Sequence, residues 1–515
     1  MSTPILLAGM QICVLLFADD TTLFSTSWGD CEALFQRYLK YTSDNGLIVN
    51  MSKSFGMAFR ADNRRAKIDE RGVLHTRGFR SQWHARSLSH NGKTIGFVEK
   101  FKYLGLVFHS DGSLVHMVQA ALAAGRRALG MLQGSLMSLG YIPYRYTLIL
   151  LDALVVSVAT YGCELWSEVP RRPEFTTAHD VFYRECLRKE LGLSKNCNIE
   201  LLHLFTGRPP LSLQMWRRRV AFFLRVLNSP IDGIASRALV ELARIEDTHR
   251  VKLWLHDTVR LIQYSDPTFR LVERRTGRGV RTLSITGTNH PQRYVYPKLP
   301  GSGWFRWWTP RSAGDPRFAE VGKFSHAMAQ EILGPIRRQF WDDAYFKLAH
   351  VSLDRSDSKL YMAALVLAYS PYSFREILSQ PSTRLHRQSL ARLLAGDLMI
   401  ARITKNWYAR EARIAEHPDS CIDCHAELGQ SFQESEAHLL FECVTTRHLH
   451  QKFLQVVKFE HTATAEEKLR IVLSSDILDV WRIFGEVAYR IWCRPRQAWR
   501  RAHIRTEWNH TAHDE

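Results

Sequence analysis

The pattern of hydrophobic and polar positions changes character near Gly112. Before it, short apolar runs are separated by turn residues, which is typical of antiparallel strands joined by tight turns. After it, apolar residues recur at the three- and four-residue spacing of amphipathic helices. The chain is therefore predicted to have an α+β fold, with short strands and a helix first and a mostly helical remainder.

The first pair of elements is expected close to the N-terminus. An apolar run over Ile12–Phe17 is followed by Ala18-Asp19-Asp20 and then by Thr21–Phe24. This order predicts a strand, a tight turn and a second strand. Asp19 and Asp20 would then lie at the tip of a hairpin.

Further strands and turns are expected before Gly112. A helix should have Asp30 as its cap and end at Asn45-Gly46, and a short strand should begin in Leu47–Asn50. Asn91-Gly92 has the composition of a two-residue hairpin turn, whereas Phe101–Phe108 is predicted to be one strand.

Longer helices are expected in the rest of the chain. They cover Leu114–Met137, Tyr144–Tyr161, His179–Leu191 and Leu211–Leu227. Thr276–Pro316 is rich in Gly, Pro, Arg and aromatic residues, so it is predicted to be irregular or a linker. Helices are expected again from about Lys323.

Composition adds charge to this picture. Lys and Arg number 69 against 51 Asp and Glu, which gives a net charge of +18, and hydrophobic residues make up 45% of the chain. The apolar content suffices for folded cores, and the charge favours a polyanion, either nucleic acid or an anionic membrane. The apolar runs Ile5–Phe17 and Tyr146–Tyr161 are too short or interrupted to span a bilayer. We therefore expect nucleic acid as the partner and no membrane.

The placement of cysteines indicates a metal centre. Nine cysteines, most of them scattered, favour a reducing compartment, nuclear or cytoplasmic, over a disulfide framework. Cys421-x2-Cys424 and His438-x4-Cys443 supply three thiolates and one imidazole, which suits a tetrahedral, structural zinc ion. Unrelated cysteines are the alternative, and a ligand swap would involve a nearby histidine: His417, His425, His448 or His450.

The adjacent acids Asp19 and Asp20 allow two interpretations. Two acids at a turn are common turn chemistry. Two-metal phosphoryl transfer also needs clustered carboxylates, and a hairpin tip between apolar strands would hold them on a rigid support. The acid pair alone does not separate these interpretations.

The order of the following motifs resembles the palm of a reverse transcriptase from non-LTR (LINE-type) retrotransposons. Phe17–Phe24 resembles the catalytic hairpin, Gly46–Ser54 resembles the next palm motif, and Phe101–Gly105 resembles the primer grip. Tyr161–Trp166 is similar to a string in the helical thumb of these enzymes. The cysteine and histidine set is similar to their C-terminal knuckle.

The resemblance implies roles for individual residues. Asp19, with Asp20 as its neighbour in the acidic cluster, would bind Mg²⁺ if the polymerase site is completed, and Lys53 would act near the leaving pyrophosphate. Tyr103-Leu104-Gly105 would help to hold the primer end. A solvated lysine and ordinary strand packing are the alternative interpretations of these positions.

One part of the family pattern is not found in the sequence. An earlier palm aspartate and the fingers that bind template and nucleotide do not occur before Asp19. Two-metal catalysis needs carboxylates from more than one strand. The chain alone is therefore expected to be inactive as a polymerase, as a degenerate copy or as a fragment of a longer reading frame.

The expected organisation has five parts. They are a partial palm at residues 1–112, a helical thumb at 113–230, a helical connector at 231–385, a zinc-knuckle module at 386–460, and a helix with a basic tail at 461–515. The expected function is that of the C-terminal part of an RNA-directed DNA polymerase, with an RNA template or DNA target as partner.

Two other functions remain open. One is a non-enzymatic zinc protein that binds nucleic acid, and the other is a metal-dependent nuclease that uses Asp19 and Asp20.

Two segments mix aromatic rings with arginines: Trp304–Trp308 and Trp492–Arg501. This composition suits either stacking on bases or ordinary core packing.

Overall fold

A computed structural model shows the chain as two compact units. It describes residues 5–59, 67–68, 74–75, 87–138, 142–169, 177–229, 233–249, 253–275, 281–288, 316–351, 361–395, 421, 424, 435–444, 446–459 and 463–492. Unit 1 contains Met1–Ala124, Ala159–Glu174 and Ser212–Ile336, and unit 2 contains Gly125–Val158, Phe175–Leu211 and Arg337–Glu515. This division into two units does not test the five predicted parts, which stay a prediction.

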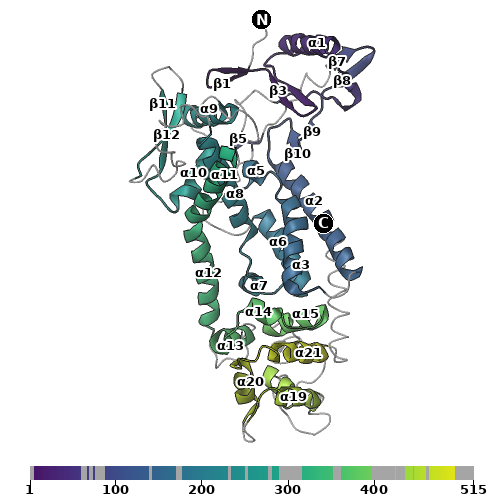
Figure 1. Cartoon of the computed structure of the whole chain (residues 1–515), viewed down its shortest axis with the longest axis vertical. Coiled ribbons are helices and arrows are strands. Elements are labelled where there is room, and N and C mark those ends of the chain that lie inside the picture. Colours follow the sequence, from purple (N-terminus) through teal and green to yellow (C-terminus); the bar gives the residue numbers. More distant parts are fainter. Residues whose placement is uncertain are drawn as a thin grey trace. The chain divides into compact units, whose positions relative to one another are not determined.

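Unit 1 carries all the strands that the structure describes, and each pairs with one antiparallel partner (Figure 1). The hairpins are β1 (Ile5–Leu7) with β2 (Met10–Ile12), β3 (Val14–Phe17) with β4 (Asp20–Leu23), β5 (Lys67–Ile68) with β6 (Leu74–His75), β7 (Ser87–His90) with β8 (Lys93–Gly96), β9 (Lys100–Tyr103) with β10 (Leu106–His109), and β11 (Arg270–Arg275) with β12 (Arg281–Thr286). Within the described residues, no two of these hairpins join into a larger sheet.

Tight turns define the hairpins near the N-terminus. The hairpin predicted around Ala18-Asp19-Asp20 is confirmed, with Asp20 already in the second strand, and the turn predicted at Asn91-Gly92 is confirmed. The prediction of one strand over Phe101–Phe108 is wrong, because the chain reverses at Leu104 (φ 47°) and Gly105 (φ 83°). Positive φ at both turn residues matches the twist of a hairpin. The turn was not predicted because Leu104 is apolar and continues the hydrophobic pattern of a strand.

Helix α1 (Trp28–Asp44) follows the second hairpin and confirms the predicted helix. Its cap is Ser27 and not Asp30, because the Ser27 hydroxyl accepts the backbone N–H of Asp30 and donates to the Asp30 carboxylate. Asp30 therefore assists the cap from the first turn, where a negative charge is favourable. Asn45-Gly46 ends the helix as predicted.

A small apolar core holds α1 against hairpin β7–β8. Its buried residues are Phe35, Leu39, Met51, Leu88 and Ile95. Met51 comes from the short 3-10 helix η1 (Met51–Lys53).

The strand predicted to begin in Leu47–Asn50 is not formed. The Asn50 side chain instead accepts the backbone N–H of Lys53 and so caps η1. The spacing of Asn50 and Lys53, within the segment that resembles a palm motif, thus has a local structural cause, which is the cap of a helical turn.

Helices complete unit 1. They are α5 (Cys163–Trp166), α8 (Leu211–Leu227), α9 (Ile234–His249), α10 (Trp254–Gln263) and α11 (Pro316–Ile332), and α2 (Val115–Ser138) contributes residues to both units. Part of the segment predicted to be irregular, Thr276–Pro316, forms β12 and pairs with β11. Most of that segment, including Trp304–Trp308, lies outside the described residues.

Unit 2 is helical throughout the part that the structure describes. Its helices are α3 (Tyr144–Leu150), the π-helix η4 (Leu151–Val156), α6 (Ala178–Leu191), α7 (Ile199–Thr206), α13 (Tyr361–Tyr369), α14 (Phe374–Leu378), α15 (Arg384–Leu394), α18 (Glu436–Phe441), α19 (Arg447–Leu454), α20 (Ala465–Leu473) and α21 (Val480–Trp492), with α4 (Ser157–Ala159) and α12 (Gly334–Ala349) at the unit boundaries. The predicted helices over Tyr144–Tyr161 and His179–Leu191 are confirmed within a few residues.

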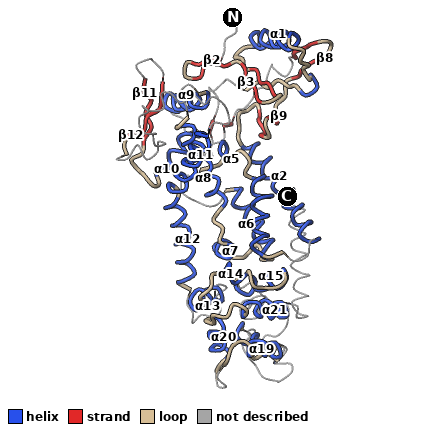
Figure 2. The backbone as a smooth tube through the Cα atoms, in the orientation of Figure 1, coloured by secondary structure: helices blue, strands red, loops and turns tan. Residues whose placement is uncertain are grey.

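The whole is a mixed fold in which helices predominate, as the α+β prediction requires. Figure 2 shows short paired strands, with helices making up most of the described backbone. Among the described helices, none is both long enough and apolar enough to cross a bilayer.

Candidate metal centre

Helix α18 in unit 2 positions two of the predicted zinc ligands. Ser435 caps the helix by accepting the backbone N–H of His438, which places this histidine in the first turn. Past the helix end, the backbone N–H of Cys443 returns to the carbonyl of His438 at 2.8 Å. This return bond brings Cys443 back beside the histidine across a spacing of five residues.

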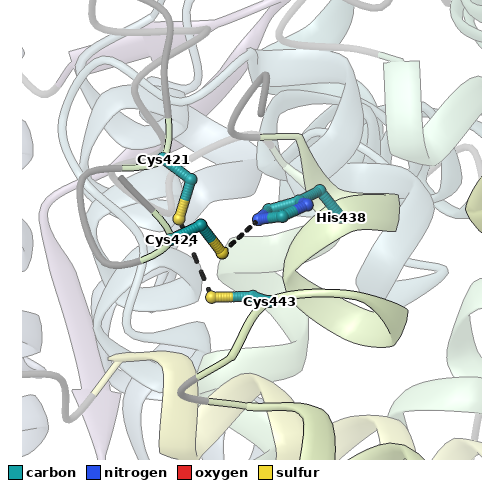
Figure 3. Close-up of side chains that lie close together, drawn as sticks. All are labelled: Cys421, Cys424, His438 and Cys443. Atoms are coloured by element: carbon teal, nitrogen blue, oxygen red, sulfur yellow. Dashed lines mark hydrogen bonds between the residues drawn. The ribbon is translucent and has the colours of Figure 1, made fainter. Parts of the chain in front are cut away.

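The four predicted ligands converge in a buried cluster. Figure 3 shows the sulfurs of Cys421, Cys424 and Cys443 directed toward one another and toward His438. The four ligand atoms all lie within 4.8 Å of one another, and all four residues are buried. The sulfurs of Cys421 and Cys443 are 3.7 Å apart, and the Cys424 sulfur is 3.4 Å from Nε2 of His438.

These separations suit a tetrahedral ion. Bonds of about 2.3 Å to sulfur and about 2.0–2.1 Å to nitrogen place tetrahedral ligand atoms roughly 3.3–3.8 Å apart. The sulfur–sulfur and sulfur–nitrogen distances of the cluster both fall in that range. The residues therefore fit a zinc ion, and four protein ligands leave no open position for a substrate.

A carboxylate supports the histidine from its other side. Nδ1 of His438 lies 3.5 Å from the carboxylate of Glu442, while Nε2 faces the sulfurs. At this separation Glu442 gives the ring a charge partner and no hydrogen bond that would fix its orientation. Sequence reasoning missed Glu442, although its position four residues after His438 on a helix was a usable signal.

Protonation of the cysteine and histidine ligands opposes metal binding at this cluster. Burial raises the pKa of the Cys424 thiol. Although burial disfavours the charged His438 ring, its contacts with Cys443 and Glu442 raise the pKa of His438. Zinc binding should therefore release protons, because thiolates and neutral imidazole are the species that bind.

The predicted acid pair lies on hairpin β3–β4 in unit 1. Phe17 pairs with Asp20, so Asp19 is a turn residue and Asp20 begins the return strand. Both are exposed, as is Lys53 on η1. Within the described residues, no third carboxylate, histidine or cysteine joins the two acids in a metal-binding group, and Mg²⁺ has no support there.

Two motifs that are distant in sequence contact each other in unit 1. The Tyr161 hydroxyl donates to the carbonyl of Leu104 at 2.9 Å. A side chain at Gly105 would lie 2.7 Å from the Tyr161 ring, and one at Gly162 would lie 2.5 Å from Leu106. The Tyr103-Leu104-Gly105 turn is thus packed on Tyr161-Gly162, whereas its proposed contact with a primer stays a prediction.

Several candidate residues are not tested by the structure. His417, His425 and nearly all of Trp492–Arg501 lie outside the described residues. His448 and His450 are on α19, and neither belongs to the buried cluster.

The cluster is the strongest functional feature of the described chain because it combines burial, convergence and a specific donor set. A metal ion held by this set would tie Cys421 and Cys424 to α18. No protein-family model matches the chain, and no similarity is found to curated proteins or to solved structures.

Proposed function

We propose that the chain is a nucleic-acid-binding protein with a structural zinc centre, derived from the C-terminal part of a LINE-type reverse transcriptase. The observation that carries the proposal is the convergence of Cys421, Cys424, His438 and Cys443 into one buried set. The net charge of +18 supports a polyanionic partner. The order of motifs from the acid hairpin to the zinc ligands supports the family assignment.

A cationic surface on unit 1 supports nucleic-acid binding. The pKa of His326 on α11 is lowered, first by partial burial and then by the charges of nearby arginines of α8, which are Arg217, Arg225 and Arg218. Arg218 is paired with Glu164 at 2.8 Å. Arg217 and Arg225 are exposed, so this face offers positive charge to a phosphate backbone.

The guanidinium of Arg225 lies 5.4 Å from the centroid of the Phe222 ring. Stacking on an aromatic ring limits the orientations of the guanidinium and leaves its N–H groups available for phosphate oxygens. We expect contacts with the backbone of the nucleic acid and little sequence preference, because phosphate contacts carry no base information.

The test is the salt dependence of binding to labelled single-stranded and duplex oligonucleotides. The zinc-loaded chain should bind with an affinity that falls steeply as salt rises. Replacing both Arg217 and Arg225 by Gln should lower the affinity and reduce the log–log salt slope by about 0.7–0.9 for each phosphate that is no longer neutralised.

The matched control is Arg244→Gln. Arg244 is an exposed arginine of unit 1 that pairs with Glu241 on α9, whereas the arginines near His326 belong to α8. This variant should bind as the unmodified chain does. Absence of binding at low salt would contradict the proposed function, and equal losses in the control and the double variant would contradict the proposed surface.

A further inference from the structure

A second cluster of metal-binding side chains lies in unit 1, where β10 leads into α2. His109 is the last residue of β10, Asp111 lies in the following turn, and His116 is in the first turn of α2. Their ligand atoms all lie within 4.8 Å of one another, and all three residues are half-buried.

The carboxylate of Asp111 occupies the centre of this cluster. Its Oδ1 is 2.9 Å from Nδ1 of His109, and its Oδ2 is 3.4 Å from Nε2 of His116. The two imidazole rings are stacked, with centroids 3.9 Å apart and 15° between their planes. One carboxylate and two imidazole nitrogens therefore already face one another.

The backbone around the cluster is fixed by local hydrogen bonds. Oδ1 of Asp111 accepts the backbone N–H of Ser113 at 2.8 Å, and the N–H of Gly112 donates to the carbonyl of His109 at 3.0 Å. Gly112 has a φ of 74°, which favours glycine and allows the tight reversal. The N–H of Ser110 is bonded to the carbonyl of Glu99, which anchors the end of the hairpin. The three donors are thus held by one short, braced segment.

We propose that His109, Asp111 and His116 bind one divalent transition-metal ion of the zinc or nickel type. Imidazole and carboxylate are good ligands for such ions, and the negative charge of Asp111 partly balances the charge of the ion. The ion would be bound by Nδ1 of His109, a carboxylate oxygen of Asp111 and Nε2 of His116, which are the atoms that face one another in the structure.

This site differs from the cysteine-rich cluster in its chemistry. Three protein donors leave at least one position for water or for an anionic oxygen ligand, whereas Cys421, Cys424, His438 and Cys443 fill a tetrahedral shell. The partly exposed cluster is open to exchange with solvent. The ion at His109, Asp111 and His116 should therefore be bound more weakly and exchange faster than the ion at the four buried ligands.

The experiment measures zinc per full-length chain by equilibrium dialysis against a fixed excess of free Zn²⁺, with the free metal of the outer compartment subtracted. The unmodified chain should retain two ions. Asp111→Asn and His116→Gln should each retain one, and so should Cys443→Ser, which removes a ligand of the other site. His90→Gln is the matched control, since His90 is a half-buried histidine of unit 1 outside the cluster, and it should retain two.

Cobalt substitution separates the two sites by spectroscopy. Co²⁺ at the cysteine-rich site gives intense sulfur-to-metal charge-transfer bands, and Co²⁺ at the histidine–aspartate site gives only weak ligand-field bands. Asp111→Asn should lose the weak bands and keep the charge-transfer bands, which also shows that the variant is folded. The proposal is overturned if the second ion persists in Asp111→Asn and His116→Gln, if His90→Gln loses it equally, or if the unmodified chain retains only the ion that Cys443→Ser abolishes.

Discussion

At the residue scale, burial determines how a single histidine of unit 2 responds to pH. His203 is buried on α7, where its Nδ1 donates to the carbonyl of Arg208 at 2.7 Å. Burial lowers the pKa of His203 to about 4. Between that value and 6.5, the unfolded chain binds a proton that the folded chain does not, so stability falls as the pH falls through this window.

Replacing His203 by Asn should flatten the pH dependence of unfolding between pH 6.5 and 4. The amide of Asn can still donate to the Arg208 carbonyl but does not take up a proton. The titration of His203 should contribute roughly 3 kcal/mol over the full window. Urea unfolding measured across this window tests the prediction.

His350→Asn is the control, because His350 also faces a backbone carbonyl, that of Phe346, but is exposed. The control should keep the pH dependence of the unmodified chain. Equal slopes for all three proteins would show that His203 is not the group responsible.

The acid pair allows a second test of single residues. Asp19 and Asp20 come from one hairpin, and no third metal ligand joins them among the described residues. Two-metal phosphoryl transfer depends on well-positioned ions, so the 515-residue chain alone should not extend a primer with Mg²⁺ or Mn²⁺. Extension that disappears in Asp19→Ala would contradict this prediction and would mean that another carboxylate completes the site.

At the element scale, local signals predicted the structure where they were strong. Asn91-Gly92 was a sufficient signal for its turn because both residues tolerate positive φ. Leu104-Gly105 forms a similar turn, but Leu104 gave no such signal, since its conformation depends on the packing of Tyr161. Hairpin β11–β12 was missed because its second strand lies in Thr276–Pro316, whose overall content of Gly, Pro, Arg and aromatic residues suggested an irregular segment.

The zinc ligands were predictable for a different reason. The spacing of Cys421, Cys424, His438 and Cys443 carries the geometry of a metal shell in the sequence itself. The set of His109, Asp111 and His116 has no comparably specific spacing. These three side chains form a group only in the folded structure, where the end of a strand, a turn and the start of a helix lie together.

A buried ion pair joins α6 to α15 within unit 2. The guanidinium of Arg387 donates to the carboxylate of Glu190 at 2.6 Å, and both residues are buried. Glu190→Gln should destabilise unit 2 by about 3–5 kcal/mol, because it leaves the charge of Arg387 without its main partner. Denaturant unfolding of the full chain measures this loss.

The control for this ion pair is Glu185→Gln, since Glu185 pairs with Lys189 on the exposed side of the same helix. The control should cost less than about 1 kcal/mol. Adding Arg387→Met to Glu190→Gln should recover much of the stability, because the buried charge is removed. A Glu190→Gln effect as small as that of the control would show that the pair contributes little.

At the scale of the whole molecule, the two units carry different chemistry. Unit 1 contains the described hairpins, the exposed acid pair and the arginines near His326. Unit 2 is helical where it is described and contains the cysteine-rich cluster. The proposed function combines a cationic surface on unit 1 with a structural ion in unit 2. The surface and the ion can be tested separately.

The most direct test of the zinc centre is X-ray absorption at the zinc edge on the full chain loaded with one equivalent of zinc. We predict three sulfur ligands at about 2.3 Å and one nitrogen ligand at about 2.0–2.1 Å. Cys443→Ser should lower the sulfur count, and Cys197→Ser, which changes a buried cysteine outside the cluster, should not. A shell of nitrogen and oxygen alone, or no bound zinc, would contradict the central claim.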